Sequence, residues 1–518
     1  MAEVVVAIDA GTTVVKAAVF GLDGSRLGSG RALVKSVRTP SGIAEQDMGE
    51  VWASAVEATR IALSQVPFVA VRAVGVCGQG DGAWLVDENM RPVRPAVTWL
   101  DSRARDIVAE WRAGGEADLV ERVSWSGLFP GALLPILAWF ARHEPDTLKR
   151  ARWHLNCKDW IRYQLTGHIC TDPTDAARTA LDVVSGAYNG EILGELGLAS
   201  TARLLPEIRP SGEVVGVVHG AAAEATGIGA GTPVIVGMMD GPAASVGVGA
   251  ISPGAGCGTI GTTASYGIIS GFPRIAQSSV GFCLPQGATG NWLISMAQMD
   301  GTPVLEWLRV NLASDMLWPE LEALAAQVPA GSDGLLFLPY LSGSGERAPF
   351  VNPNARGGFI GMTSRHGRAA MARAVYEGIA LGMADCVGIL GCEKDVRISG
   401  GGAASPFLMQ LMADASQLPV EVPTDLDAGL RGTAALAGVA VGAYADLSGS
   451  LNFAGESGRR YEPDPAVGDV YARLLDALAL SRAALGETWS SLLDGHQELP
   501  RRGRPGGRRF GQVSSSIR

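Results

Sequence analysis

The sequence predicts an α/β protein of two domains, and three observations support this fold class. The chain has 518 residues, 47% of them hydrophobic and only 18% charged, whereas a single core stops growing at roughly 250–300 residues. Short β-branched runs alternate with segments of helical spacing, as in α/β architecture. The strand–turn–strand pattern of residues 4–20 also starts again at residues 257–269.

The boundary between the domains is expected near residue 250. Residues 247–254 are rich in Gly and end in Pro-Gly, which is typical of a connection, and the second strand–turn–strand segment follows directly. We therefore expect a first domain at residues 1–250, a second at 251–485 and a tail at 486–518. The last residues, 499–518, are rich in Arg, Gly and Ser without apolar periodicity, which predicts disorder.

Each half begins with a hairpin and continues with alternating strands and helices. In the first half, strands are expected at 4–8 and 14–20, a helix at 49–63, and strands at 71–76 and 234–236. In the second half, the hairpin at 257–269 is followed by strands near 334–338 and 395–399 and helices near 369–384 and 407–417. The strand ends and turns of such a fold present the polar residues.

Composition and charge exclude several function classes. A formal charge of −10 argues against nucleic acid or an anionic membrane as the main partner. The longest apolar stretch, residues 234–251, is interrupted by Asp240 and Pro242, so it is not a membrane span. The seven cysteines are scattered and form no C-x-x-C pair, which favours a reducing cytoplasm. A small-molecule substrate fits this composition best.

Two hydroxyl-rich turns and a glycine cluster have the chemistry of a nucleotide site. In the first turn, residues 9–13, glycine permits a tight bend, the threonine hydroxyls can meet phosphate oxygens, and Asp9 can hold Mg²⁺ directly or through water. The second turn, residues 258–263, repeats this chemistry. The cluster at 399–405 lets the backbone approach a base and ribose, although it is neither a dinucleotide fingerprint nor a Walker A sequence. An ordinary polar hairpin would look much like the first turn alone.

These three elements, with Asp240 between the first two, resemble the FGGY carbohydrate kinase family of the actin/hexokinase/Hsp70-like ATPase superfamily. The resemblance covers residues 4–444. Further similar stretches lie at 45–47, 99–103, 158–167, 345–349 and 354–361. It implies two ribonuclease-H-like domains with the active site in the cleft between them and ATP and Mg²⁺ as cofactors, and it is compatible with a homodimer.

The resemblance also implies residue roles. Asp240 is expected to be the catalytic base and Asp9 the metal ligand. The expected ATP-binding residues are Gly11, Thr12, Thr13, Lys16, Gly261, Thr262, Thr263, Gly301, Gly401, Gly402 and Ser405. The physics agrees, because phosphoryl transfer depends on positioning and charge neutralisation, and one carboxylate suffices to accept the proton of the attacking hydroxyl.

The acceptor is expected to contact residues at strand ends that face the crevice: Gln79, Asp81, Trp99, Asp101, Arg103 and Asp240. An ionised Asp81 accepts hydrogen bonds from two vicinal hydroxyls but offers nothing to a ketone oxygen, which favours a polyol. Gly80 is expected to leave room for a chain longer than glycerol. Residues 78–87 look most similar to the erythritol kinases of the family, which predicts phosphorylation of erythritol to erythritol 4-phosphate.

Other readings stay open. In one alternative, Asp81 only caps a turn and other residues choose the substrate. In another, the acceptor is a ketopentose, L-xylulose or D-xylulose. A non-catalytic ATP-switched protein would need the nucleotide turns but no base at Asp240. A dinucleotide-dependent polyol dehydrogenase would need a Rossmann fingerprint at a first β–α turn, whereas the first turn here leads into another strand.

Overall fold

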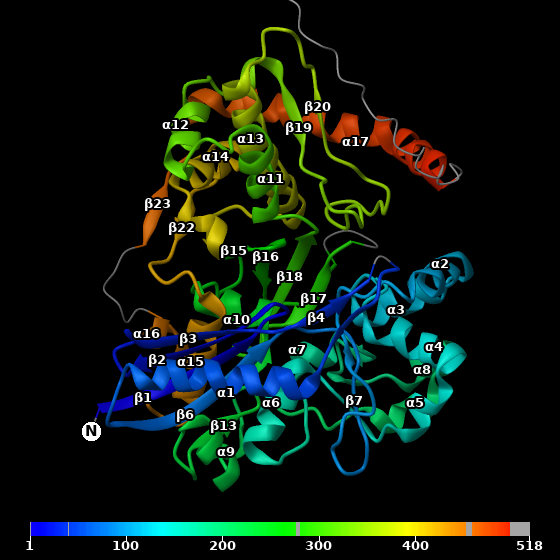
Figure 1. Ribbon diagram of the computed structural model, residues 1–518, viewed down its shortest axis with the longest axis vertical. Coiled ribbons are helices and arrows are strands. Elements are labelled where there is room, and N and C mark those ends of the chain that lie inside the picture. Colours follow the sequence, from blue (N-terminus) through cyan, green and yellow to red (C-terminus); the bar gives the residue numbers. More distant parts are fainter. Residues whose placement is uncertain (1, 40, 276–279, 452–457, 498–518) are drawn as a thin grey trace, which may run out of the picture.

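The computed structural model describes residues 2–39, 41–275, 280–451 and 458–497, and it has two α/β bodies, each built on a seven-stranded sheet (Figure 1). The N-terminal sheet and its helices occupy the lower part of Figure 1, and most of the C-terminal half lies above them. The predicted fold class is confirmed.

The first sheet is centred on a strand whose middle is completely buried. β1 (Ala2–Ala10) pairs with β2 (Val14–Gly21) in the predicted hairpin and runs parallel to β6 (Val69–Gly78). The sheet is completed by β3 (Arg26–Leu33), β12 (Val214–Val217), β13 (Pro233–Ile235) and β14 (Met238–Met239). Residues 4–8 have no exposed surface, which explains why the strand is a continuous apolar run.

The second sheet repeats this plan. β15 (Gly256–Ile260) and β16 (Ala264–Ser270) form the second hairpin, and β15 runs parallel to β21 (Val396–Ser399) as β1 does to β6. The other strands are β17 (Phe282–Pro285), β18 (Trp292–Gln298), β22 (Val420–Val422) and β23 (Arg459–Tyr461). The strand expected near 334–338 is β19 (Leu336–Leu338), which forms a separate two-stranded sheet with β20 (Gly358–Ile360).

Helices cover the sheets and form an insertion that the sequence analysis did not resolve. α1 (Met48–Ser64) begins where Asp47 accepts a hydrogen bond from the Glu50 amide, and it buries its alanine stripe against the sheet. The insertion after β6 contains α2 (Arg105–Gly114), α3 (Glu116–Ser124), α4 (Leu133–His143), α5 (Pro145–Arg150), α6 (Cys157–Thr166), α7 (Pro173–Ala176) and α8 (Gly190–Glu195), followed by α9 (Gly220–Thr226). The upper body contains α11 (Thr302–Leu312), α12 (Trp318–Ala326), α13 (Arg368–Leu390) and α14 (Pro406–Ser416).

Short strands and turns of helix complete the chain. They are β4 (Ser36–Arg38), β5 (Ala44–Gln46), β7 (Trp84–Val86), β8 (Ala96–Val97), β9 (Trp153–Leu155), β10 (Leu181–Asp182), β11 (Ala187–Tyr188), α16 (Leu447–Leu451) and the 3-10 turns Ala199–Leu204, Ser332–Gly334, Gly401–Ala404 and Pro465–Val467.

Two helices cross where the bodies meet. α10 (Asp240–Gly247) and α15 (Ala428–Ala440) approach so closely that a Cβ on Gly247 would lie 1.8 Å from the Ala428 carbonyl oxygen, and one on Gly432 would lie 2.0 Å from that of Ala243. α15 packs its apolar face on β1 and β6. Residues 428–440 thus join the core of the first body although they were expected within 251–485, because the chain returns to the first sheet after β22.

The C-terminal helix α17 (Gly468–Gln497) extends along the upper body (Figure 1). It includes the first residues of the expected tail and buries Trp489. Residues 498–518, for which disorder was predicted, lie outside the described residues. All seven cysteines are described, buried and unpaired. Within the described ranges, no helix has the length and apolar character needed to cross a bilayer.

Candidate active site

A cavity of about 760 Å³ lies between the two bodies and brings together most of the predicted site. The predicted residues that line it are Asp9, Thr12, Thr13, Lys16, Gln79, Asp81, Trp99, Asp240, Gly261, Thr262, Thr263 and Gly401. Those not among its lining are Gly11, Asp101, Arg103, Gly301, Gly402 and Ser405. The two hairpin turns therefore face one space, as expected for a site that holds phosphates.

The second turn is shaped by its neighbours. A Cβ at Gly301 would lie 2.4 Å from the Gly261 carbonyl oxygen, and that oxygen accepts the Thr302 amide at 2.7 Å. Gly301 thus lets the following segment pack under the turn, which leaves Thr262 exposed at the tip. Gly402 packs on Ile260 in the same way, while Ser405 caps α14 and donates to Glu322. These glycines and Ser405 support the site from behind.

Asp240 lies between β14 and the cavity that separates the two bodies. It follows β14, which pairs with β6, and is the first residue of α10, where its Oδ1 accepts the Gly241 amide at 2.7 Å. The Asp240 side chain is exposed into the cavity, whose walls come from both bodies. Burial, together with the negative charges of Asp9 and Asp81, raises the pKa of Asp240 to about 7. A base with a pKa near the working pH is effective in proton transfer.

Asp9 fits a divalent cation. It is the last residue but one of β1, and burial raises its pKa above the ordinary value although Lys16 opposes this. Its Oδ1 is buried and has no hydrogen-bond partner among the described residues. Unpartnered carboxylate oxygens are costly in a buried site, and Mg²⁺ in phosphotransferases is usually bound by one or two carboxylates plus phosphate oxygens.

Thr12 and Gln79 belong to one hydrogen-bond chain. The Thr12 hydroxyl accepts from Trp99 Nε1 at 2.9 Å and donates to Gln79 Oε1 at 3.0 Å, and Gln79 Nε2 donates to Gln46 Oε1 at 2.8 Å. Gln46 Nε2 returns to the Thr12 carbonyl oxygen at 2.6 Å. These hydrogen bonds fix the first turn against Trp99. Gln46 was not predicted as a site residue, although it lies in the stretch 45–47 that resembled the family.

Asp81 lies in a strained turn beside a buried arginine. Its φ of 60° is in the left-handed region, which is uncommon for a non-glycine residue and clusters at functional sites. Arg178 Nε donates to both carboxylate oxygens at 3.2 and 3.3 Å, and its guanidinium lies 4.3 Å from the centre of the Phe282 ring. Arg178 and Arg347 both line the cavity. Neither was predicted, because the arginines approach Asp81 only through the tertiary fold.

Asp101 and Arg103 lie in the wall and not at the cavity. Asp101 accepts the Ala44 amide at 2.7 Å and the Arg103 Nε at 2.8 Å, and Arg103 also pairs with Glu45. Their charges are used within the protein, so the predicted contact with the acceptor is not supported by their position. They hold β5 next to the segment that carries Trp99.

Gly80 lines the cavity and lies against Met239. A Cβ there would lie 2.1 Å from Met239 Sδ and 3.2 Å from Asp175 Oδ1. The missing side chain makes room for Met239, and the expected room for a longer acceptor stays a prediction.

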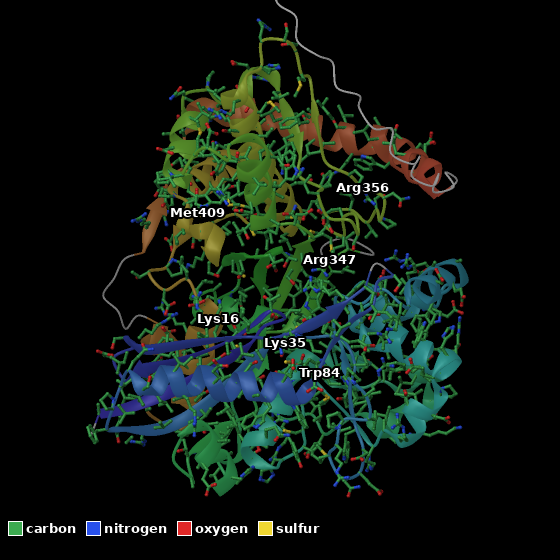
Figure 2. The ribbon with its side chains drawn as sticks, viewed as in Figure 1. Lys16, Lys35, Trp84, Arg347, Arg356 and Met409 are labelled. Carbon is green, nitrogen blue, oxygen red and sulfur yellow. The ribbon has the colours of Figure 1, made fainter. Side chains whose placement is uncertain are left out.

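Lys16 is tied to the C-terminal half. Its Nζ lies 2.6 Å from Asp427 Oδ1, and Arg26 pairs with Asp427 and Asp425. These pairs lower the pKa of Asp427 to about 2 despite burial. Lys16 lies between the two bodies in Figure 2 and links the first hairpin to the segment that precedes α15.

A completely buried ion cluster lies behind Asp240. Lys158 Nζ is 2.6 Å from Asp159, 3.0 Å from Asp172 and 3.0 Å from Asp175. Asp172 accepts the Thr174 hydroxyl, whose oxygen in turn accepts the Met239 amide at 2.8 Å. The cluster therefore fixes the residue immediately before Asp240. The segment containing Lys158 resembled the family, but its role in support was not predicted.

Comparisons with known proteins agree with this geometry. Residues 4–247 match the model of the N-terminal domain of the FGGY family of carbohydrate kinases, and residues 257–441 match that of its C-terminal domain. The chain is 33% identical to an erythritol kinase of Brucella abortus, over 95% of this chain and 98% of that protein. It is 32% identical to a xylulose kinase of Escherichia coli, over 84% and 90%. The crystal structure of gluconate kinase from Lactobacillus acidophilus superposes with a TM-score of 0.89 at 28% identity, over 95% of this chain and 100% of that one.

Proposed function

Because this chain belongs to the FGGY family of carbohydrate kinases, it is a kinase of sugars or polyols, and we propose that it uses ATP to phosphorylate a terminal hydroxyl of a small polyol, with erythritol as the first candidate. The observation that carries the polyol assignment is the Asp81 carboxylate, held by Arg178 within the same cavity as Asp240. Similarity to an erythritol kinase along nearly the whole chain supports the choice of acceptor.

The chemistry follows from the arrangement of the two carboxylates. The acceptor hydroxyl lies at Asp240, which takes its proton while the hydroxyl oxygen bonds to the γ-phosphorus and the bond to the ADP oxygen breaks. The turns at 12–13 and 261–263 surround the phosphates with hydroxyl and amide donors. Asp9 would hold Mg²⁺, which neutralises phosphate charge when bound.

Asp81 selects hydroxyl groups in this proposal. Arg178 keeps the carboxylate in place and offsets its charge, although burial still raises the pKa of Asp81 above the ordinary value. The remaining lone pairs of the carboxylate can accept hydrogen bonds from neighbouring acceptor hydroxyls. A substrate carbonyl oxygen at that position would face the carboxylate, and both groups can only accept hydrogen bonds.

Asp81→Ala tests this selection. We expect kcat/KM for erythritol and ribitol to fall roughly 10–100-fold, as for the loss of charge-assisted hydrogen bonds, and that for xylulose to fall much less. Steady-state kinetics with each acceptor at saturating ATP measures the ratio. Asp106→Ala removes an exposed carboxylate of α2 and is the matched control. An unchanged polyol-to-ketose ratio would remove Asp81 from this role.

A ketopentose kinase is the second candidate. Two arginines beside Asp81 supply donors that suit a ketone oxygen, and the similarity to a xylulose kinase is nearly as high in identity as that to the erythritol kinase. This alternative keeps the roles of Asp240 and of the hairpin turns and changes only the acceptor.

A further inference from the structure

Arg347 crosses from the C-terminal body to the wall of the N-terminal body. It lies in the loop between β19 and β20, and its Nε donates to the Ala297 carbonyl oxygen of β18 at 2.9 Å. Its guanidinium carbon is 5.1 Å from the centre of the Trp99 ring and 5.7 Å from that of Phe129. Figure 2 places Arg347 between the two bodies.

The guanidinium has donors to spare. Among the described residues, Nε of Arg347 donates one hydrogen bond, whereas Nη1 and Nη2 have no hydrogen-bond or ion-pair partner. The adjacent Glu346 does not neutralise it by contact, since its Oε1 accepts the amides of Met299 and Arg347. Arg347 is half-buried, and burial lowers its pKa from the ordinary value. Such a group is stabilised by a polar ligand.

Its surroundings belong to the acceptor end of the cavity. Asp81 attracts the Arg347 charge, and Arg178 opposes it, so both lie within electrostatic reach. Trp99, Phe129 and Phe282 supply the apolar faces around these charges. Aromatic faces with a few directed polar groups are typical of a carbohydrate or polyol site.

We propose that Arg347 is an acceptor-binding residue supplied by the C-terminal body, whose free guanidinium N–H groups donate to acceptor oxygens opposite Asp81. The proposal rests on the kinase function proposed above. Asp81 accepts from the acceptor and Arg347 donates to it, so each hydroxyl oxygen finds the complementary partner. Because Arg347 comes from the body opposite Asp81, acceptor binding ties the two bodies together and couples to the closure that excludes water.

Arg347→Met tests the proposal, because methionine keeps an unbranched stem against Trp99 and removes the donors. We expect kcat/KM for the best acceptor to fall roughly 10–100-fold, while the KM for ATP and ATP hydrolysis without acceptor stay within about threefold. Arg347→Lys keeps the charge and one donor group, so its kcat/KM for the acceptor is expected to lie between those of wild type and Arg347→Met. Arg365→Met removes an exposed arginine of the same body and is the control.

Two further readouts separate the possible failures. Melting temperatures of both Arg347 variants show whether they fold, and calorimetric titration of wild type with erythritol or xylulose measures binding independently of turnover. A folded Arg347→Met variant with unchanged acceptor kcat/KM, or one whose KM for ATP rises as much as that for the acceptor, would overturn the proposal. If no polyol or ketose stimulates the wild type, the kinase function fails first, and that result does not depend on Arg347.

Discussion

Replacing Asp240 with Asn is expected to lower kcat roughly 10²–10⁴-fold, the usual range for a positioned general base, while the protein stays folded. The amide has the size of the carboxyl, and its oxygen can still accept the Gly241 amide. It cannot take a proton from the attacking hydroxyl. Initial rates of ADP release with saturating ATP and acceptor give kcat, and thermal melting gives stability.

The pH dependence provides a second readout of the same residue. Asp240 acts only when ionised, and its pKa is raised to about 7, so wild-type kcat/KM for the acceptor is expected to fall as the pH drops through about 7. The residual activity of Asp240→Asn should lack this acidic limb. Asp106→Asn, on an exposed turn of α2, should match wild type. Near-wild-type turnover of Asp240→Asn would remove Asp240 from the role of base.

Replacing Lys158 with Met is expected to destabilise the protein by about 3–5 kcal/mol, as when one partner of a buried ion pair is removed. Lys158 faces three carboxylates with no exposed surface. Without the ammonium, the one cation among the described residues that still pairs with this cluster is Arg162, which contacts Asp159 at 2.8 Å. Chemical denaturation of the full-length protein, followed by tryptophan fluorescence, measures the change in the free energy of unfolding.

Lys149→Met is the matched control for this change. Lys149 is exposed and pairs with Asp146 one helical turn away, and such surface pairs contribute about 0–1 kcal/mol. If Lys158→Met were no more destabilising than Lys149→Met, the cluster would not support Met239 and Asp240 in the way inferred from its contacts.

Local patterns were enough to predict the hairpins and the central strands. Residues 4–8 and 14–20 are short β-branched runs on either side of a turn, and α1 shows its buried stripe as a helical period of alanines. Helix α15 is different. Its small residues show that something packs closely against it, but not that the partner is α10, whose contact depends on the chain returning to the first sheet.

The site was predictable where one segment carries the chemistry and unpredictable where separate segments meet. Asp9, Asp240 and the threonine turns lie at strand ends that share one cavity. The partners Arg178 and Arg347 come from segments far from Asp81 in sequence, so no spacing pointed to them. The contact between Gly80 and Met239 was unpredictable for the same reason. Asp101 was predicted as a site residue, but its carboxylate accepts the Ala44 amide and pairs with Arg103.

The most direct test of the account is ADP release by the purified protein with Mg²⁺ and ATP across a panel of acceptors: erythritol, glycerol, ribitol, L-xylulose, D-xylulose and a reaction without acceptor. The account predicts strong stimulation by erythritol or another polyol and weak stimulation by the ketoses. Selective stimulation by a ketopentose would contradict the role given to Asp81 and leave the kinase chemistry in place. No stimulation by any acceptor in the panel would contradict the proposed function.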